Sequence, residues 1–244
     1  MIDPFAIVRA IATLAAAIVL GSSFLIWYTR DALAPAGGSV WRRRVVLSVL
    51  AAAFAGAVAT GLGAVVAAAA AAEISAFSID ATVFAAFLTK TGVGRIAIFE
   101  IVCAVTVCIP AVIAWVTLKK SSISDFSLLS SAAVAGLGLA AFPFNSHPVT
   151  LDQQAAGLLS SVAHRLALAT WLGGLPALIL LIGAGPVPDD TRRLAVVVLR
   201  RFSRVATVAM CVILASGVLL TWFLVRNFPA LIGTDYGHLL LIKL

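Results

Sequence analysis

Residues 160–175 read SSVAHRLALATWLGGL and belong to an apolar run, Leu158–Gly183, that is long enough to cross a lipid bilayer. A membrane-spanning helix needs about 20 mostly apolar residues. The run contains His164, one of three histidines in the chain. Because an imidazole in or beside a lipid-facing helix is costly without a partner or a ligand, this stretch predicts a membrane helix that carries a functional side chain.

Five more apolar runs flank this one, and the six together are Pro4–Tyr28, Val45–Ala72, Ile96–Leu118, Phe126–Phe142, Leu158–Gly183 and Phe202–Val225. A seventh begins near Gly237 and reaches the last residue, Leu244. The sequence therefore predicts an all-α, polytopic transmembrane helix bundle with six full spans plus the start of a seventh helix. We expect residues 1–244 to form a single integral-membrane domain that is cut within its last helix.

The composition agrees with a lipid environment. Hydrophobic residues make up 62% of the chain and charged residues 11%, whereas a soluble domain carries about 25% charged residues. The net charge of +7 does not indicate nucleic-acid binding, because the basic residues lie in short loops and form no patch with interleaved aromatic residues. The expected partner of most of the surface is the lipid bilayer.

Charge also predicts the orientation. Most basic residues lie in three loops, 29–44, 119–125 and 184–201, and the positive-inside rule places these loops in the cytoplasm. The N-terminus and the alternate loops then face outward, which is the periplasm if the protein lies in a bacterial inner membrane. In the outer loop 73–94, residues Asp80–Thr89 have the pattern of a short interfacial helix.

Several polar side chains gather at the predicted outer end. Arg9 lies in the first span, Arg95 and Glu100 begin the third, and His164 and Arg165 begin the fifth. A buried glutamate usually pairs, so we expect a structural ion pair of Glu100 with Arg95 or Arg9; the alternative is a supporting or gating role beside a functional site. The asymmetry predicts a polar site that opens to the outside.

The histidines are the candidate metal ligands, because imidazole commonly binds copper, zinc, iron and nickel. His164 is the first candidate, and its alternative is a histidine that is hydrogen-bonded to a neighbouring helix. Trp171 shares its helix face, while Gly173 and Gly174 permit a kink or close packing. His147 lies in a loop between two prolines and can fold back over the fifth span, and His238 at another outer border is a third candidate.

Other chemistry finds no support in the sequence. There is no phosphate-binding loop, no Ser/His/Asp arrangement and no HExxH pattern, so we expect no enzyme. The three cysteines lie within predicted spans without a CxxC spacing and are expected to be packing residues; they are Cys103, Cys108 and Cys211.

A set of motifs in fixed order resembles the copper resistance protein D (CopD) family of bacterial inner-membrane proteins. The motifs are Thr91-Gly92-Val93-Gly94-Arg95, Ser146-His147-Pro148, His164 with Trp171-Leu172-Gly173-Gly174-Leu175, Arg201–Ala206 with Ser216-Gly217, and Tyr236–Leu244. The resemblance spans nearly the whole chain. The family usually continues beyond the last motif, and we expect no fused extracellular copper-binding domain.

The resemblance implies a copper ion as the bound species, with import from periplasm to cytoplasm as the expected function. It implies copper-ligand roles for His147 and His164 at the periplasmic end, and we expect Trp171, Gly173 and Gly174 to shape the helix beneath them. Delivery then needs a separate periplasmic copper-carrying protein, and a homo-oligomer is left open.

Two other functions remain open on the residues alone. One is a membrane electron-transfer protein with b-type haem, which needs two axial histidines deep in facing helices. The other is an accessory subunit that delivers copper without transporting it. A visible absorption spectrum and a copper flux measurement separate these alternatives.

Overall fold

A computed structural model describes residues 4–33, 39–145, 154–183 and 189–225. Its elements are α1 (Pro4–Tyr28), α2 (Arg30–Leu33), α3 (Ser39–Ala71), η1 (Ala76–Ser78), α4 (Ala81–Lys90), α5 (Gly92–Thr106), α6 (Cys108–Val116), α7 (Ser121–Ala141), η2 (Phe142–Asn145), α8 (Gln154–Ile182) and α9 (Asp189–Val225). The described residues contain no strand, so the all-α prediction is confirmed. The seventh predicted helix lies outside the described residues.

Six stretches of the described chain are long and apolar enough to cross a membrane: Phe5–Tyr28, Val40–Ala71, Gly92–Val116, Ser122–Phe144, Ala155–Ile182 and Arg192–Phe223. Each overlaps one of the six predicted spans. Helix α3 has an exposed apolar stripe. Phe54, Val58 and Leu62 in this stripe are 52–63% exposed at a spacing of four residues. An apolar stripe of this kind suits lipid as the solvent.

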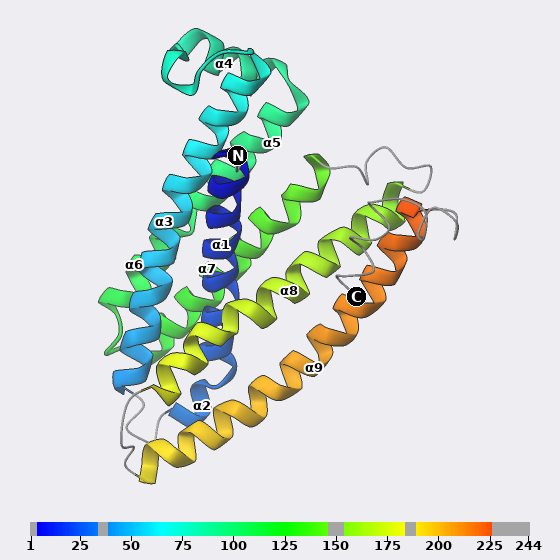
Figure 1. The fold of residues 1–244 in the computed structure, drawn as a ribbon. Helices are drawn as coiled ribbons and strands as arrows, with labels where there is room; N and C mark the ends of the chain where they lie inside the picture. Colours follow the sequence, from blue (N-terminus) through cyan, green and yellow to red (C-terminus); the bar gives the residue numbers. More distant parts are fainter. Residues whose placement is uncertain (1–3, 34–38, 146–153, 184–188, 226–244) are drawn as a thin grey trace.

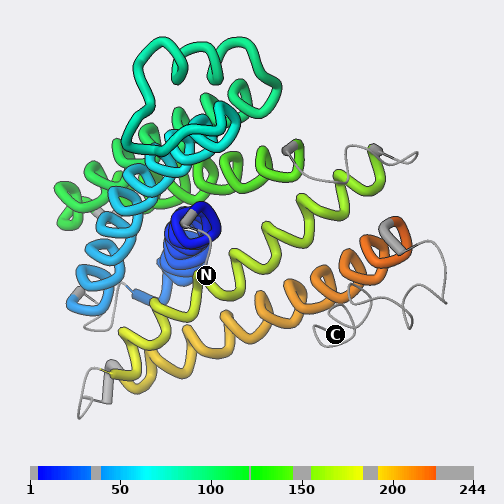
Figure 2. Tube along the Cα trace, turned by 45° about the horizontal axis from the view of Figure 1, so that its top comes forward, coloured from blue at the N-terminus to red at the C-terminus, as the bar shows by residue number. Residues whose placement is uncertain are grey.

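Helix α1 runs through the middle of the bundle (Figure 1). It packs against α3, α7 and α8, and α8 in turn carries α9 on its other side. Figure 2 looks more nearly along α1 and shows it between α3 and α8. We call the end at which α1 and α8 begin the upper end, and the end that holds α2 and the turn between α6 and α7 the lower end (Figure 1).

Three glycines allow α8 to approach α1 and α9 closely. A Cβ atom on Gly173 would lie 1.7 Å from the carbonyl oxygen of Ala17, and one on Gly21 would lie 2.4 Å from the backbone of Gly173. A Cβ on Gly174 would lie 2.7 Å from the ring of Phe202 in α9. Ser22 also donates to the carbonyl oxygen of Gly173 at 2.6 Å. The predicted close packing at Gly173-Gly174 is therefore present, and it determines the spacing of α1, α8 and α9.

The third span is divided. Helix α5 ends at Thr106 and α6 begins at Cys108, with Pro110 in the first turn of α6. A proline has no backbone N–H and its ring crowds the carbonyl group four residues earlier, which here is that of Thr106. The division is thus a consequence of Pro110, and it was not predicted from the apolar run.

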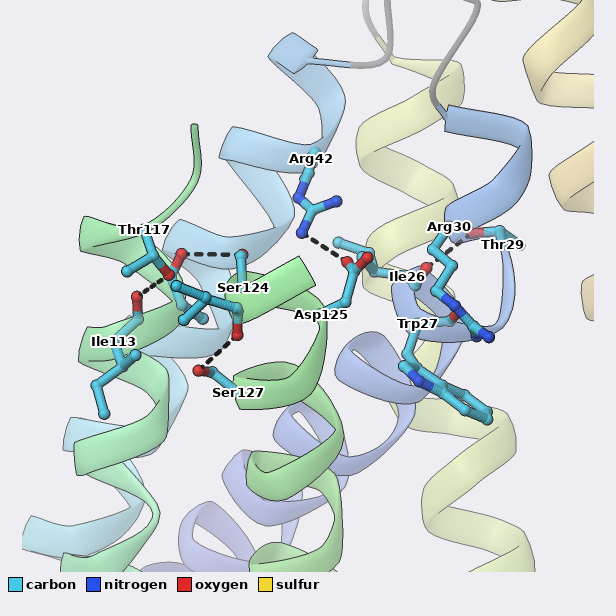
Figure 3. Close-up of polar contacts among 12 residues, drawn as sticks. Ile26, Trp27, Thr29, Arg30, Arg42, Ile113, Thr117, Ser124, Asp125 and Ser127 are labelled. Carbon is cyan, nitrogen blue, oxygen red and sulfur yellow. Dashed lines mark hydrogen bonds and ion pairs between the residues drawn. The ribbon is translucent and has the colours of Figure 1, made fainter. Parts of the chain in front are cut away.

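Polar contacts tie the helices together at the lower end. Arg42 of α3 lies 2.6 Å from the carboxylate of Asp125 in α7, and both side chains are largely buried (Figure 3). The indole N–H of Trp41 donates to the carbonyl oxygen of Ala177 in α8 at 2.7 Å. Arg42, which the sequence marked only as part of a cytoplasmic loop, therefore also joins two helices, because a buried guanidinium needs a partner.

The predicted basic loop 184–201 is wrong in its second part, because α9 already begins at Asp189. Its first turns bury Leu194, Val198 and Phe202, each at most 7% exposed, in the i, i+4, i+8 pattern of a helix that packs on one side. The hydropathy pattern placed the helix start at Phe202 because the arginines of this segment mask that stripe. The helix predicted at Asp80–Thr89 is confirmed as α4, whose first turn is capped by the Asp80 carboxylate, and its place at a membrane interface stays a prediction.

An ion pair of α9 with α2 leads to a prediction on pH. Arg201 donates to both carboxylate oxygens of Asp31, with an Nη2–Oδ2 distance of 2.6 Å. This hydrogen bond lowers the pKa of Asp31 from 3.8 to about 2. The folded pKa lies below the unfolded one, so the pair stabilises the fold above pH 3.8, and its contribution is lost as the pH falls toward 2.

Asp31→Asn is therefore expected to lower the melting temperature slightly at neutral pH and not at pH 2. Thermal unfolding of the detergent-solubilised protein across this range measures the difference. Because Asp31 is largely exposed, the effect should be small and should shrink with added salt. A deficit that persists unchanged at pH 2 would contradict an electrostatic origin.

Candidate metal site and charged cluster

His164 lies in α8, where its half-buried imidazole faces α9. The Nδ1 atom is 3.2 Å from the carbonyl oxygen of Ile213 and 3.1 Å from the hydroxyl oxygen of Ser216. Gly217, the next residue in α9, leaves room for the ring, since a Cβ there would be 3.8 Å from its Cε1 atom. The predicted alternative of a hydrogen bond to a neighbouring helix is thus present on one side of the ring.

The acceptors around Nδ1 select a tautomer. The Ile213 carbonyl can only accept, and the Ser216 hydroxyl donates to the carbonyl oxygens of Val212 and Ile213. In the tautomer that the Ile213 carbonyl favours, Nδ1 carries a proton and Nε2 keeps its lone pair. No described residue forms a hydrogen bond with Nε2, and metal-binding histidines characteristically donate their other ring N–H to a carbonyl in this way.

Next to His164, Arg165 points to a different neighbour. Its guanidinium carbon lies 3.5 Å from the centre of the Phe142 ring, and that of Arg9 in α1 lies 3.7 Å from the same centre. Two guanidinium groups cannot share the space so close above one face, so they lie on opposite faces of the ring. We call Arg9, Phe142 and Arg165 the arginine–phenylalanine stack.

Glu100 in α5 lies near this stack and feels the charges of Arg9 and Arg165. Within the described residues, however, no Lys, Arg or His nitrogen lies within 4.0 Å of its carboxylate. The expected direct ion pair with Arg9 or Arg95 is therefore wrong. The guanidinium of Arg9 is occupied by aromatic rings, and the side chain of Arg95 is exposed at the start of α5.

The structure thus separates the predicted site residues into two groups. Arg9, Glu100 and Arg165 surround Phe142, whereas His164 faces α9. Trp171 packs at the edge of the core, and Gly173-Gly174 lie where α8 meets α1 and α9. His147 and His238 lie outside the described residues, and the described residues contain no group of three or more His, Cys, Asp or Glu side chains that could hold a metal ion.

Sequence reasoning gave no role to Ser216 and Phe142. The Ser216-Gly217 pair was noticed only as part of a motif, and its spacing from His164 predicts no contact without the packing of α8 on α9. Phe142 was read as the end of an apolar span. The cysteines agree with a packing role in part: none forms a disulfide, and Cys103 is buried while Cys211 is exposed.

These features define a class: a polytopic α-helical membrane protein with a histidine and several charged side chains within its spans. The family model described as "Copper resistance protein D-like, N-terminal domain" matches residues 1–158, and the model described as "Copper resistance protein D" matches residues 196–244. The chain belongs to the copper resistance protein D family, a family of copper-handling membrane proteins.

One curated relative is the "Copper transport protein CutJ" of Bacillus subtilis (strain 168). It is 34% identical over 128 residues, which cover 52% of this chain and 23% of the relative. The match thus spans about a quarter of the relative's length. No solved structure matches the chain.

Proposed function

We propose that this protein imports copper from the periplasm toward the cytoplasm through the bacterial inner membrane, with its N-terminus in the periplasm. His164 is the central ligand, His147 is the expected second ligand, and His238 is a third candidate. The chain acts as a transporter rather than as an enzyme. Copper is the cargo, and a separate periplasmic copper-carrying protein supplies it.

The observation that carries the proposal is the fixed imidazole of His164. The contacts of Nδ1 with Ile213 and Ser216 hold the ring in place, and in the tautomer with the proton on Nδ1 the Nε2 lone pair is available to a metal. Imidazole suits both common oxidation states of copper. The arrangement of charges supports the orientation, since the basic ends of the helices lie together at the lower end and His164 lies toward the upper end (Figure 1).

Copper flux tests the function directly. The protein is reconstituted into lipid vesicles, and the vesicles are sorted by whether an N-terminal tag is accessible from outside. Vesicles with an outward N-terminus should accumulate copper from the medium faster than protein-free vesicles. Copper binding without flux would instead favour an accessory subunit, and a Soret band in the purified protein would favour a haem protein.

Ser216→Ala should weaken copper binding without removing the ligand. Loss of the hydroxyl leaves Nδ1 with only the Ile213 carbonyl, so the ring orientation and tautomer are less firmly fixed. Substitution of such an orienting residue typically costs about 10- to 100-fold in metal affinity. Competition with a chelator of known copper affinity measures the change.

The matched control is Ser130→Ala. Ser130 also donates to the carbonyl oxygen four residues earlier, that of Phe126, but forms no hydrogen bond with His164, the histidine that the structure describes. This variant should retain wild-type copper affinity. Equal losses in both serine variants would indicate a general effect of removing a helical hydroxyl, and unchanged affinity in Ser216→Ala would remove the support for His164 as an oriented ligand.

A further inference from the structure

A cavity of about 130 Å³ lies between α1, α3, α5 and α7, apart from His164. Along α1 its lining runs from Phe5 to Val19, a rise of about 21 Å at 1.5 Å per residue. Most lining residues are alanine, glycine, valine or phenylalanine, and the charged ones are Arg9 and Glu100, both toward the upper end. The cavity is therefore an apolar recess with charge at its upper part.

Glu100 lines this recess and carries an unusual atom. Its Oε1 is buried and has no hydrogen-bond donor among the described residues. A buried carboxylate oxygen without a donor is unfavourable unless the group takes up a proton or water reaches it. Glu100 therefore needs a compensating species that is not a side chain of the described chain.

The arginine–phenylalanine stack explains why neither Arg9 nor Arg165 pairs directly with Glu100. Arg9 and Arg165 lie against Phe142 at 3.7 and 3.5 Å, so their charge acts on Glu100 only from a distance. Burial favours the neutral carboxylic acid, whereas the two guanidinium charges favour the carboxylate. These opposing effects make the protonation state depend on where the stack holds the arginines.

The cavity offers the route for exchange. At about 30 Å³ per molecule it has room for roughly four waters. Water there finds polar partners in Arg9 and Glu100, and in Thr13 and Thr60, whose hydroxyl groups donate to backbone carbonyls and keep acceptor lone pairs. We propose that Glu100 is a proton-exchange site, served by water in this cavity and controlled by the arginine–phenylalanine stack.

The groups that face Glu100 from the packed elements are few. Arg9 in α1 and Arg165 in α8 carry positive charge, and the Cys103 thiol lies one turn further along α5. Thr60 supplies the only polar side chain among the α3 residues that line the cavity, and α7 and η2 contribute apolar residues. Lys90 in α4 and Arg95 in α5 have exposed side chains. A titration of this site therefore reports mainly on Glu100.

Infrared difference spectroscopy of the purified full chain tests the proposal. Acid-minus-alkaline spectra should contain a carboxylic-acid C=O band at the frequency of an apolar environment, and the band should shift in D2O because water reaches the group. Glu100→Gln should abolish this band. The matched control is Glu73→Gln, since Glu73 is the only other glutamate and is exposed.

The arginines supply a second readout. Arg9→Gln and Arg165→Gln each remove a charge that favours the carboxylate, so the midpoint of the band's titration should move to higher pH. A wild-type spectrum without a Glu100-dependent band, at every pH at which the protein stays folded, would overturn the proposal. A midpoint that does not respond to either arginine would overturn the role of the stack.

A measurement without any variant covers the case in which Glu100→Gln fails to fold. Hydrophobic carbodiimides modify protonated carboxyl groups in apolar sites, so wild-type protein should be labelled at Glu100, more at low pH than at high pH. Mass spectrometry of the peptide around Glu100 gives the extent. No labelling at any pH would contradict the proposal. Because none of these readouts involves copper, their outcome is independent of the proposed copper transport.

Discussion

Gly173→Ala is expected to lower the free energy of unfolding by more than a typical added methyl group does. The added Cβ would lie 1.7 Å from the Ala17 carbonyl oxygen, which belongs to the backbone and cannot rotate away. Helices α1 and α8 must therefore separate, and the Ser22 hydrogen bond to Gly173 is strained at the same time. Overpacking typically costs 1–3 kcal/mol, and we expect at least about 3 kcal/mol at this contact.

The measurement is thermal unfolding in detergent, followed by the fraction of protein that still elutes as a single species in size-exclusion chromatography. A loss of about 3 kcal/mol corresponds to a decrease of roughly 6–12 °C in melting temperature for a chain of this size. Gly61→Ala is the matched control, because Gly61 also lies within a membrane helix and a Cβ there meets nothing within 4 Å. The control should change the melting temperature by about 2 °C or less.

Equal melting temperatures of Gly173→Ala and Gly61→Ala would show that α1 and α8 do not touch at this glycine. A decrease in both would point to a general sensitivity of membrane helices to glycine replacement. The comparison thus measures the helix contact itself, since both substitutions add one methyl group to a helix and differ only in what that methyl group meets.

His164→Ala should produce the largest loss of copper affinity. The substitution removes the ligand atom, whereas Ser216→Ala only loosens its orientation. Since loss of an orienting partner costs about 10- to 100-fold, we expect loss of the ligand to cost about 100-fold or more. In the flux experiment, this variant should reduce copper uptake to nearly the level of protein-free vesicles.

A double variant tests whether Ser216 acts on copper affinity through His164. Once His164 is replaced by alanine, Ser216 no longer orients a ligand, so adding Ser216→Ala should cause little further loss of affinity. Additive losses in the double variant would mean that Ser216 acts elsewhere. Wild-type copper affinity in folded His164→Ala would remove His164 from the site, and the proposed function would then need different ligands.

Much of the fold could be predicted because lipid imposes one rule along the whole chain. Apolar runs located all six spans, whereas the placement of the basic loops in the cytoplasm stays a prediction. Details that depend on contacts were not predictable. The start of α9 was missed because its arginines hide the buried stripe of Leu194, Val198 and Phe202.

For the candidate site, too, the residues could be predicted from the sequence and their contacts could not. The rarity of histidine marked His164, and the rarity of charge within spans marked Arg9, Glu100 and Arg165. Which of them meet could not be predicted, because neighbours in sequence point to different helices. His164 and Arg165 are adjacent, yet one contacts Ser216 of α9 and the other contacts Phe142. Helical rotation of about 100° per residue separates them.

The break at Val107 gives the third span two mechanically distinct halves. The lower half is anchored, because the Ser124 hydroxyl of α7 donates to the Ala114 carbonyl oxygen of α6. The upper half carries Glu100, and Pro110 leaves the junction short of one backbone hydrogen bond. The span therefore bends most easily at its middle, and a small tilt of α5 changes the distance from Glu100 to the two arginines while α6 stays in place.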